Sequence, residues 1–89
     1  MIELVWDDPF IKIMKKWLKR HPELKNIFER QLHQFEMNPF HPSLKTHNLS
    51  GKLKDCSAFS ITHRYRLVFK FLSPDKVLLI DIGSHEEVY

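Results

Sequence analysis

Residues 65–82 read YRLVFKFLSPDKVLLIDI, and this stretch decides the fold. It contains two runs rich in aromatic and branched aliphatic residues, Tyr65–Leu72 and Lys76–Ile82, which are typical of β-strands. Ser73–Lys76, between them, has the Ser, Pro and Asp residues that favour tight turns. The stretch therefore predicts a β-hairpin.

Two further strands are expected outside this hairpin. Ser57–Ile61 is a third strand-like run, and Thr62-His63-Arg64 provides a turn between it and the hairpin. Such short links between successive strands indicate an antiparallel meander. At the amino terminus, Ile2–Trp6 alternates weakly between polar and apolar residues, which predicts a short first strand.

The sequence between the first strand and the meander predicts two helices. Asp7 followed by Pro9 is a start signal, and His21-Pro22 ends the first helix and begins the second. Asn38-Pro39 closes the helical half. The apolar stripe of the first helix comprises Phe10, Ile13, Met14, Trp17 and Leu18, and its outer face carries Lys12, Lys15, Lys16, Lys19 and Arg20. The buried stripe of the second comprises Leu24, Ile27, Phe28, Gln31 and Phe35.

Two helices followed by hairpins indicate an α+β fold. We expect an N-terminal strand and a helical hairpin packed on a small, antiparallel, twisted β-sheet. A chain of 89 residues supports one hydrophobic core, so a single domain over residues 1–89 is expected and a two-domain enzyme is excluded.

Composition narrows the class of protein. The single cysteine, Cys56, cannot form an internal disulfide, which argues against a secreted disulfide scaffold and for a reducing compartment. No apolar run approaches the ~18 residues that span a bilayer, and the start lacks a basic segment followed by an apolar one. We therefore expect a cytoplasmic protein without membrane association. Its net charge of +3 suits a polyanionic partner such as RNA, DNA or an acidic protein.

Three elements occur in order in the second half of the chain. They are His47-Asn48-Leu49-Ser50-Gly51, then Tyr65-Arg66-Leu67-Val68-Phe69, then IGSHEEVY at residues 82–89. Behind a strand and a helical hairpin, this order resembles the RelE/ParE toxins, nearest to the YafQ-like branch. The resemblance implies the RelE/ParE-type fold and a messenger-RNA interferase that cuts in the ribosomal decoding site. It also implies an acidic antitoxin partner that keeps the toxin inactive in a toxin–antitoxin hetero-oligomer.

The resemblance also assigns candidate catalytic residues. His47 and His85 match histidines of the YafQ-like active site. Arg66 matches the strand arginine of the family, and Tyr89 takes the place of its terminal aromatic residue. Metal-free RNA cleavage needs a base for the ribose 2′-hydroxyl, a cation for the charged phosphorane and an acid for the leaving oxygen. Histidine serves either proton role near neutral pH.

Each of these residues also has a structural interpretation. His47 suits a solvated loop, and Arg66 suits the polar face of an alternating strand. His85 could pair with a neighbouring glutamate, and Tyr89, as the last residue, would ordinarily fray.

Basic residues flank the candidate catalytic group. They are Lys45, Lys52, Lys54 and Arg64, and they could contact phosphates of messenger or ribosomal RNA. A solvated charged surface is the alternative. We expect no cofactor and no metal, because the six histidines show no close ligand spacing and Cys56 has no ligand-spaced partner.

The sequence departs from the family pattern on the predicted third strand. Members of the RelE branch carry lysines where this chain has Ser57 and Phe59, so a histidine-based site is implied. YafQ-like members tend to have a third histidine and an acidic residue where this chain has Ser60 and Arg64. The identity of the general base is therefore open. His63 lies nearby, but an offset of one residue on a strand would point it to the opposite face.

Three functional classes remain after the sequence analysis. The first is a ribosome-dependent endoribonuclease, favoured by His47, His85 and Arg66. The second is a ParE-like gyrase inhibitor on the same fold, which needs no acid–base residues. The third is a non-catalytic module that binds an antitoxin in a groove or at a sheet edge.

Overall fold

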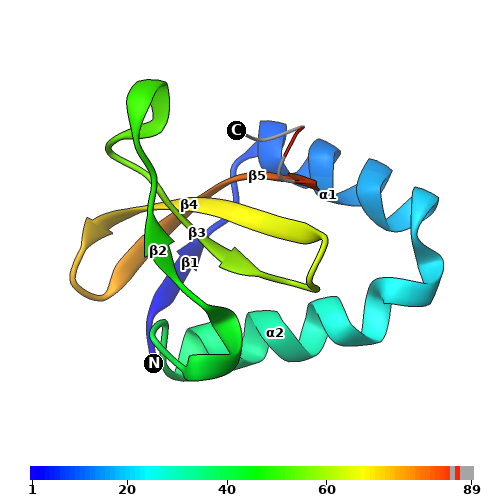
Figure 1. The fold of residues 1–89 in the computed structure, drawn as a ribbon, viewed down its shortest axis with the longest axis horizontal. Helices are drawn as coiled ribbons and strands as arrows, with labels where there is room; N and C mark the ends of the chain where they lie inside the picture. Colours follow the sequence, from blue (N-terminus) through cyan, green and yellow to red (C-terminus); the bar gives the residue numbers. More distant parts are fainter. Residues whose placement is uncertain (85, 87–89) are drawn as a thin grey trace.

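The computed structural model describes residues 1–84 and residue 86. Within them the chain forms two α-helices and a five-stranded sheet (Figure 1). The elements are β1 (Glu3–Val5), α1 (Asp8–Arg20), α2 (Lys25–Met37), β2 (His47–Asn48), β3 (Ser57–Ser60), β4 (Tyr65–Ser73) and β5 (Lys76–Ser84), with 3-10 turns at Pro22–Leu24, Pro42–Leu44 and Gly51–Leu53. The predicted α+β class is confirmed. Neither helix in the described residues is long and apolar enough to cross a membrane.

The sheet is mixed, so the prediction of an antiparallel sheet is wrong at one edge. The strand order is β1-β5-β4-β3-β2, and β1 runs parallel to β5 with Leu4 opposite Val77. The other neighbouring strands are antiparallel. Both helices and three strands separate β1 from β5 in the sequence, so no short turn fixes their relative direction.

The opposite edge of the sheet carries a strand that the sequence analysis did not predict. In β2, His47 pairs with Ala58 and Asn48 with Ser57, and the Ser57 hydroxyl donates to Asn48 Oδ1 at 3.0 Å. Two residues are too few to show an alternating pattern. For this reason the sequence alone suggests a loop at His47.

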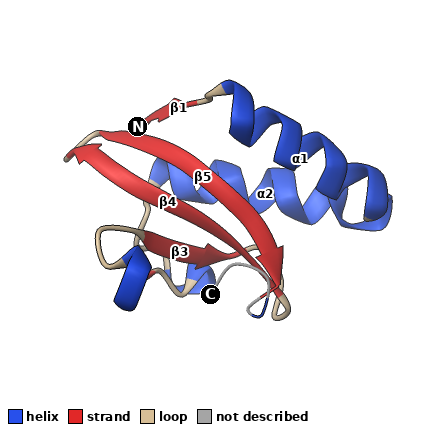
Figure 2. Ribbon diagram, turned by 90° about the horizontal axis from the view of Figure 1, so that it is seen from above, coloured by secondary structure: helices blue, strands red, loops and turns tan. Residues whose placement is uncertain are grey.

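Both helices pack on one face of the sheet (Figure 2). Phe35 of α2 is at the centre of the core and is fully buried. Its ring stacks on Phe59 of β3 with centroids 4.5 Å apart and meets Phe69 of β4 edge-on at 4.6 Å. The alternate side chains of β3 and β4 therefore point away from the helices.

Gln31 of α2 forms a hydrogen bond with the edge of β3, beyond the residues that pair with β2. Its side chain is only 7% exposed, as its place in the predicted buried stripe implies. The amide nitrogen Nε2 donates to the carbonyl of Ser60 at 3.0 Å and to that of Ser43 at 3.3 Å. Because β2 pairs only with residues 57 and 58, Gln31 supplies the donor that a longer edge strand would have given.

The start of α1 gives a first prediction about stability. Asp7 is the N-cap, and its Oδ1 accepts a hydrogen bond from the Phe10 amide at 3.0 Å. Asp7→Ala should lower the free energy of unfolding by about 1 kcal/mol, whereas Asp7→Asn, which keeps a capping oxygen, should lose much less. Urea titration of the three proteins measures the difference. Equal midpoints for Asp7→Ala and the unsubstituted chain would contradict the assigned cap.

Candidate active site

The face of the sheet away from the helices brings His47 and Arg66 to the same side. His47 pairs with Ala58, which pairs with Val68, and Ser60 pairs with Arg66 in the next row. Paired residues point to the same face of a sheet, as do residues two apart on one strand. Only β3 lies between the two candidates, and its side chains on this face, Ala58 and Ser60, are small.

One part of this face is covered by the chain between β2 and β3. Leu49 and Cys56 from that segment, with Ile80 of β5, pack on the buried side chains of Ala58 and Val68. Cys56 therefore contributes to packing, as its residue type predicts. The row that contains Ser60 and Arg66 lies beyond this cover.

His47 is exposed, and its ring is oriented by the neighbouring backbone. Its Nδ1 lies 3.0 Å from the carbonyl oxygen of Lys45. A carbonyl can only accept, so Nδ1 carries a proton and donates it in this contact. In the neutral ring Nε2 is then the basic nitrogen, which is the form that a general base requires.

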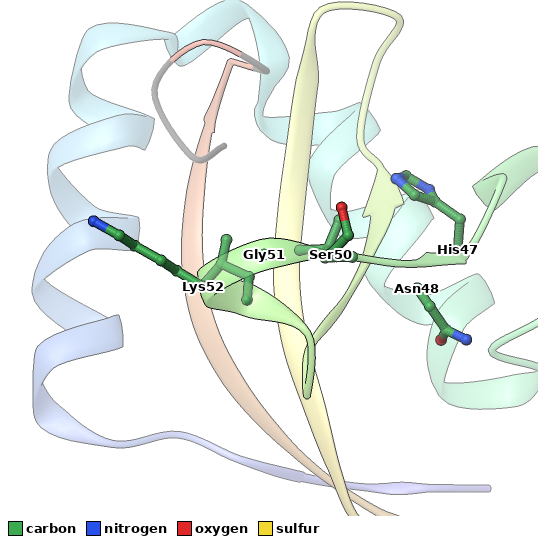
Figure 3. A pocket seen from close by; sticks show the side chains of 7 residues that line it. His47, Asn48, Ser50, Gly51 and Lys52 are labelled. Carbon is green, nitrogen blue, oxygen red and sulfur yellow. The ribbon is translucent and has the colours of Figure 1, made fainter.

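His47 and the residues that follow it in the sequence form a shallow groove. It has a volume of about 480 Å³ and is lined by the consecutive residues 47–53. Figure 3 shows His47 and Ser50 on one side of this segment, Asn48 on the other, and Lys52 extending away from His47. The chain turns at Gly51, whose φ is +67°. Residues other than glycine adopt this backbone conformation only with strain. This turn explains why the last residue of the His47–Gly51 element is a glycine.

Arg66 is half-buried and anchored at one end. Its Nη1 donates to the carbonyls of Thr62 at 3.1 Å and His63 at 2.9 Å. No other N–H of its guanidinium has a hydrogen bond to residues 1–84 or 86, so these donors are available to a ligand. The side chain is therefore neither a freely solvated arginine nor a fully satisfied structural one.

A second cavity, which we call the Gln31 hollow, lies beside Arg66. It has a volume of about 170 Å³, and Gln31, Lys45, Ser60, Thr62, His63 and Arg66 are among its lining residues. The sequence analysis noted that His63 would point to the opposite face if it lay on a strand. Residues 61–64 form a bend, in line with the turn predicted at residues 62–64, so strand alternation does not apply and His63 lines the same cavity as Arg66.

The four residues expected to bind RNA are exposed but do not form one cluster. Lys45 lines the Gln31 hollow, and Lys52 lines the groove at residues 47–53. Lys54 follows that groove directly. Arg64 lies at the bend, with its guanidinium carbon 5.5 Å from the centre of the Tyr65 ring. These residues therefore lie on three connecting segments, with Lys45 before β2, Lys52 and Lys54 between β2 and β3, and Arg64 between β3 and β4.

Two of the candidate catalytic residues, His85 and Tyr89, lie outside the described residues. β5 ends at Ser84, directly before His85 in the sequence, and Gly83 pairs with Arg66. As for metals, residues 1–84 and 86 contain no group of three or more His, Cys, Asp or Glu side chains that could bind an ion.

The sequence analysis missed two residues of the Gln31 hollow. Gln31 was expected in the buried stripe, and Thr62 was expected only as part of a turn. A polar residue within an apolar helical stripe was the available signal for Gln31, because a buried amide needs partners. Nothing in the sequence distinguished Thr62 from an ordinary turn residue.

Comparison with known proteins finds similar folds among solved structures. No protein-family model and no curated protein sequence matches the chain. Among solved structures, YafQ from Escherichia coli BL21(DE3) superposes with a TM-score of 0.80 at 19% identity, over 100% of this chain and 99% of that one. A copper-bound mutant toxin from Helicobacter pylori gives 0.72 at 27% identity over all of both chains. The E. coli DinJ–YafQ complex gives 0.74 at 21% identity, over 100% and 99%.

Proposed function

Because this chain has the fold of the RelE/ParE-type toxins, we propose that it is the toxin of a type II toxin–antitoxin pair and cuts messenger RNA on the ribosome. The observation that carries the proposal is the position of His47 and Arg66 on one face of the sheet, with only small side chains between them. A base for the 2′-hydroxyl and a cation for the phosphorane are two of the three groups that metal-free RNA cleavage requires. The ribosome and its message place this activity in the cytoplasm.

The proposed reaction is an internal transfer at phosphorus. Nε2 of His47 takes the proton of a ribose 2′-hydroxyl, and the 2′-oxygen attacks the adjacent phosphorus. A bond from O2′ to phosphorus forms, the bond from phosphorus to O5′ breaks, and a proton passes to O5′. Arg66 donates from its unbound N–H groups to the charged phosphorane, where an oriented cation contributes most. The products are a 2′,3′-cyclic phosphate and a 5′-hydroxyl.

The acid that protonates O5′ comes from one of two histidines. His85 is assigned to this role by the family resemblance, with Tyr89 near it as the terminal aromatic residue. His63 is the candidate within the described residues, since it lines the Gln31 hollow with Arg66. Lys45, Lys52, Lys54 and Arg64 contact phosphates on either side, where they position the RNA without reading its sequence.

The purified chain should cut RNA chiefly during translation. A basic domain this small has little surface with which to orient a flexible message, and the ribosome supplies that order. Primer extension on a translated message should show discrete stops at codon positions, and the same message without ribosomes should remain largely intact. Uncut message with trapped gyrase–DNA complexes would assign the ParE-like activity instead. Loss of both effects would leave the non-catalytic antitoxin-binding role.

An acidic antitoxin should compete with RNA for the same basic surface. The DinJ–YafQ complex is a precedent for a partner protein on this fold, and the net charge of +3 favours an acidic one. Induction of the chain alone should arrest growth, and co-expression of the acidic protein encoded beside it should restore growth. In a binding assay, that protein and an RNA oligonucleotide should exclude each other. Simultaneous binding of both would count against a shared surface.

A further inference from the structure

A β-bulge in β5 turns Asp81 toward the face of the sheet that carries the candidate active site. Val68 of β4 pairs with Asp81, but the next residue of β4 pairs with Leu79, so Ile80 is an extra residue in β5. Ile80 packs on Val68, on the face away from the helices. Because paired residues point to the same face of a sheet, Asp81 lies on that face too.

The bulge keeps the Asp81 carboxylate out of the hydrophobic core. Leu79 and Ile82 both lie in the core beneath the helices, although they are three residues apart and regular alternation would require an even spacing. Without the extra residue, Asp81 would point into that core, where an unpaired carboxylate is costly. Bulges are frequent beside active sites, where they redirect a side chain.

The Asp81 carboxylate is half-buried and held in one direction by the backbone. Its Oδ1 accepts a hydrogen bond from the amide of Ile82 at 2.8 Å. This bond to a neighbouring amide fixes the orientation of the whole carboxylate. A carboxylate fixed in this way can orient a histidine ring and favour its charged form.

The charges around Asp81 are mostly positive. Asp81 is the one acidic residue in strands β2 to β5, and on its face of β4 the charged neighbours are Arg66 and Lys70, two residues to either side of Val68. The segment between β2 and β3, which covers part of this face, carries Lys52, Lys54 and Asp55. Cations on this face attract RNA phosphates and a carboxylate repels them. A carboxylate here is therefore useful if it acts on a group of the protein.

We propose that the Asp81 carboxylate pairs with the imidazolium of His85 and holds it ready as the acid that protonates O5′, an inference that rests on the proposed function. Alternate residues of a strand share a face, so Gly83 follows Asp81 on the catalytic side and has no side chain that could intervene. His85 comes two residues later in the sequence. The proton passes from His85 to O5′ as the bond from phosphorus to O5′ breaks, and the ring is left neutral. Asp81 contacts the histidine and not the RNA, so it is a positioning residue.

The first arm of the test needs neither RNA nor ribosomes. The histidine ring signals of the purified chain are followed by NMR as the pH is raised, and those of His85 are identified by their absence in His85→Ala. Asp81→Asn should lower the midpoint of the His85 titration by about one pH unit, because a nearby carboxylate favours the imidazolium and an amide does not. Asparagine keeps an oxygen for the Ile82 amide, so the bulge should persist. Asp81→Ser, which also keeps an acceptor oxygen, should give the same shift.

Two further variants control for charge and for another partner. Asp75→Asn is the matched control, because Asp75 lies in the turn at the far end of β5 and also makes a local hydrogen bond, with Ser73. It removes the same charge and should leave the His85 midpoint unchanged. Glu86→Gln, beside His85 in the sequence, should have little effect. An unchanged midpoint in Asp81→Asn, or a larger shift in Glu86→Gln, would overturn the pair.

The second arm measures the pH profile of single-turnover cleavage on the ribosome. An acid that must be protonated gives a rate that falls on the alkaline side. In Asp81→Asn this fall should begin about one pH unit lower, so the variant should be about tenfold slower at alkaline pH and unchanged on the acid side. A shifted His85 midpoint with an unshifted cleavage profile would overturn the catalytic role of the pair.

The inference and the proposed function can fail separately. If the unsubstituted chain cuts no message, the proposed nuclease is overturned, and the NMR titration still decides whether Asp81 and His85 are paired. If messages are cut and the His85 titration does not respond to Asp81→Asn, the pair is overturned and the nuclease stands.

Discussion

Arg66→Ala should lower the single-turnover rate of message cleavage by about a hundredfold or more, the usual cost of removing a donor that stabilises transition-state charge. The guanidinium is anchored at Nη1 and has its other donors available, so its removal affects the phosphorane directly. Stability should also fall, because two hydrogen bonds to the bend are lost. That loss should be about 1 kcal/mol, too little to unfold a typical domain.

Two controls separate catalysis from charge and from folding. Lys16→Ala removes one exposed positive charge from α1 and should cut at nearly the unsubstituted rate. Arg66→Lys keeps the charge but lacks the planar fork, so it should recover only part of the activity. Cleavage of Arg66→Ala at the unsubstituted rate, with normal thermal melting, would remove Arg66 from the active site.

His47→Ala should cost a similar factor, because loss of a proton-transfer group typically costs a hundredfold or more in rate. Its side chain is exposed, and substitutions at exposed positions usually change stability by about half a kcal/mol or less. The distinguishing readout is the pH profile of single-turnover cleavage. A general base gives a rate that rises with pH on the acid side, and this rise should disappear in His47→Ala.

The same measurement on His85→Ala and His63→Ala identifies the acid. The variant that lacks the acid should lose the fall in rate on the alkaline side of the profile, and the other should retain it. Early melting of His85→Ala would mean instead that His85 supports the fold. An unchanged pH profile in His47→Ala would contradict its role as the base.

Much of the fold could be predicted because most of its helices and strands are long enough to show a regular pattern of hydrophobic residues. The stripe from Phe10 to Leu18 identified α1, and the runs around Ser73–Lys76 identified the hairpin of β4 and β5. The direction of β1 could not be predicted, because strand direction is set by tertiary packing when no short turn joins the strands. The same limit applied to β2, whose two residues have no detectable alternation.

The sequence could predict which residues belong to the candidate site but not how they are arranged in space. The resemblance to the RelE/ParE toxins named His47 and Arg66, but their shared face depends on the register of three strands. The sequence analysis predicted the turn at residues 62–64, but strand alternation, which it considered for His63, does not apply in that bend. Gln31 became visible through its hydrogen bonds to Ser43 and Ser60, which are distant from it in sequence. Thr62 became visible through local bonds from the amides of Arg64 and Tyr65 within the bend.

The chemistry of the cut ends tests the central claim most directly. A message translated in the presence of the purified chain is recovered, and both ends at each cut are identified. Attack by the 2′-oxygen, assisted by His47 and Arg66, predicts a 5′-hydroxyl on one fragment and a 2′,3′-cyclic phosphate on the other. These ends should be about a hundredfold rarer with Arg66→Ala or His47→Ala. Fragments with 5′-phosphates, or intact message with trapped gyrase–DNA complexes, would contradict the account.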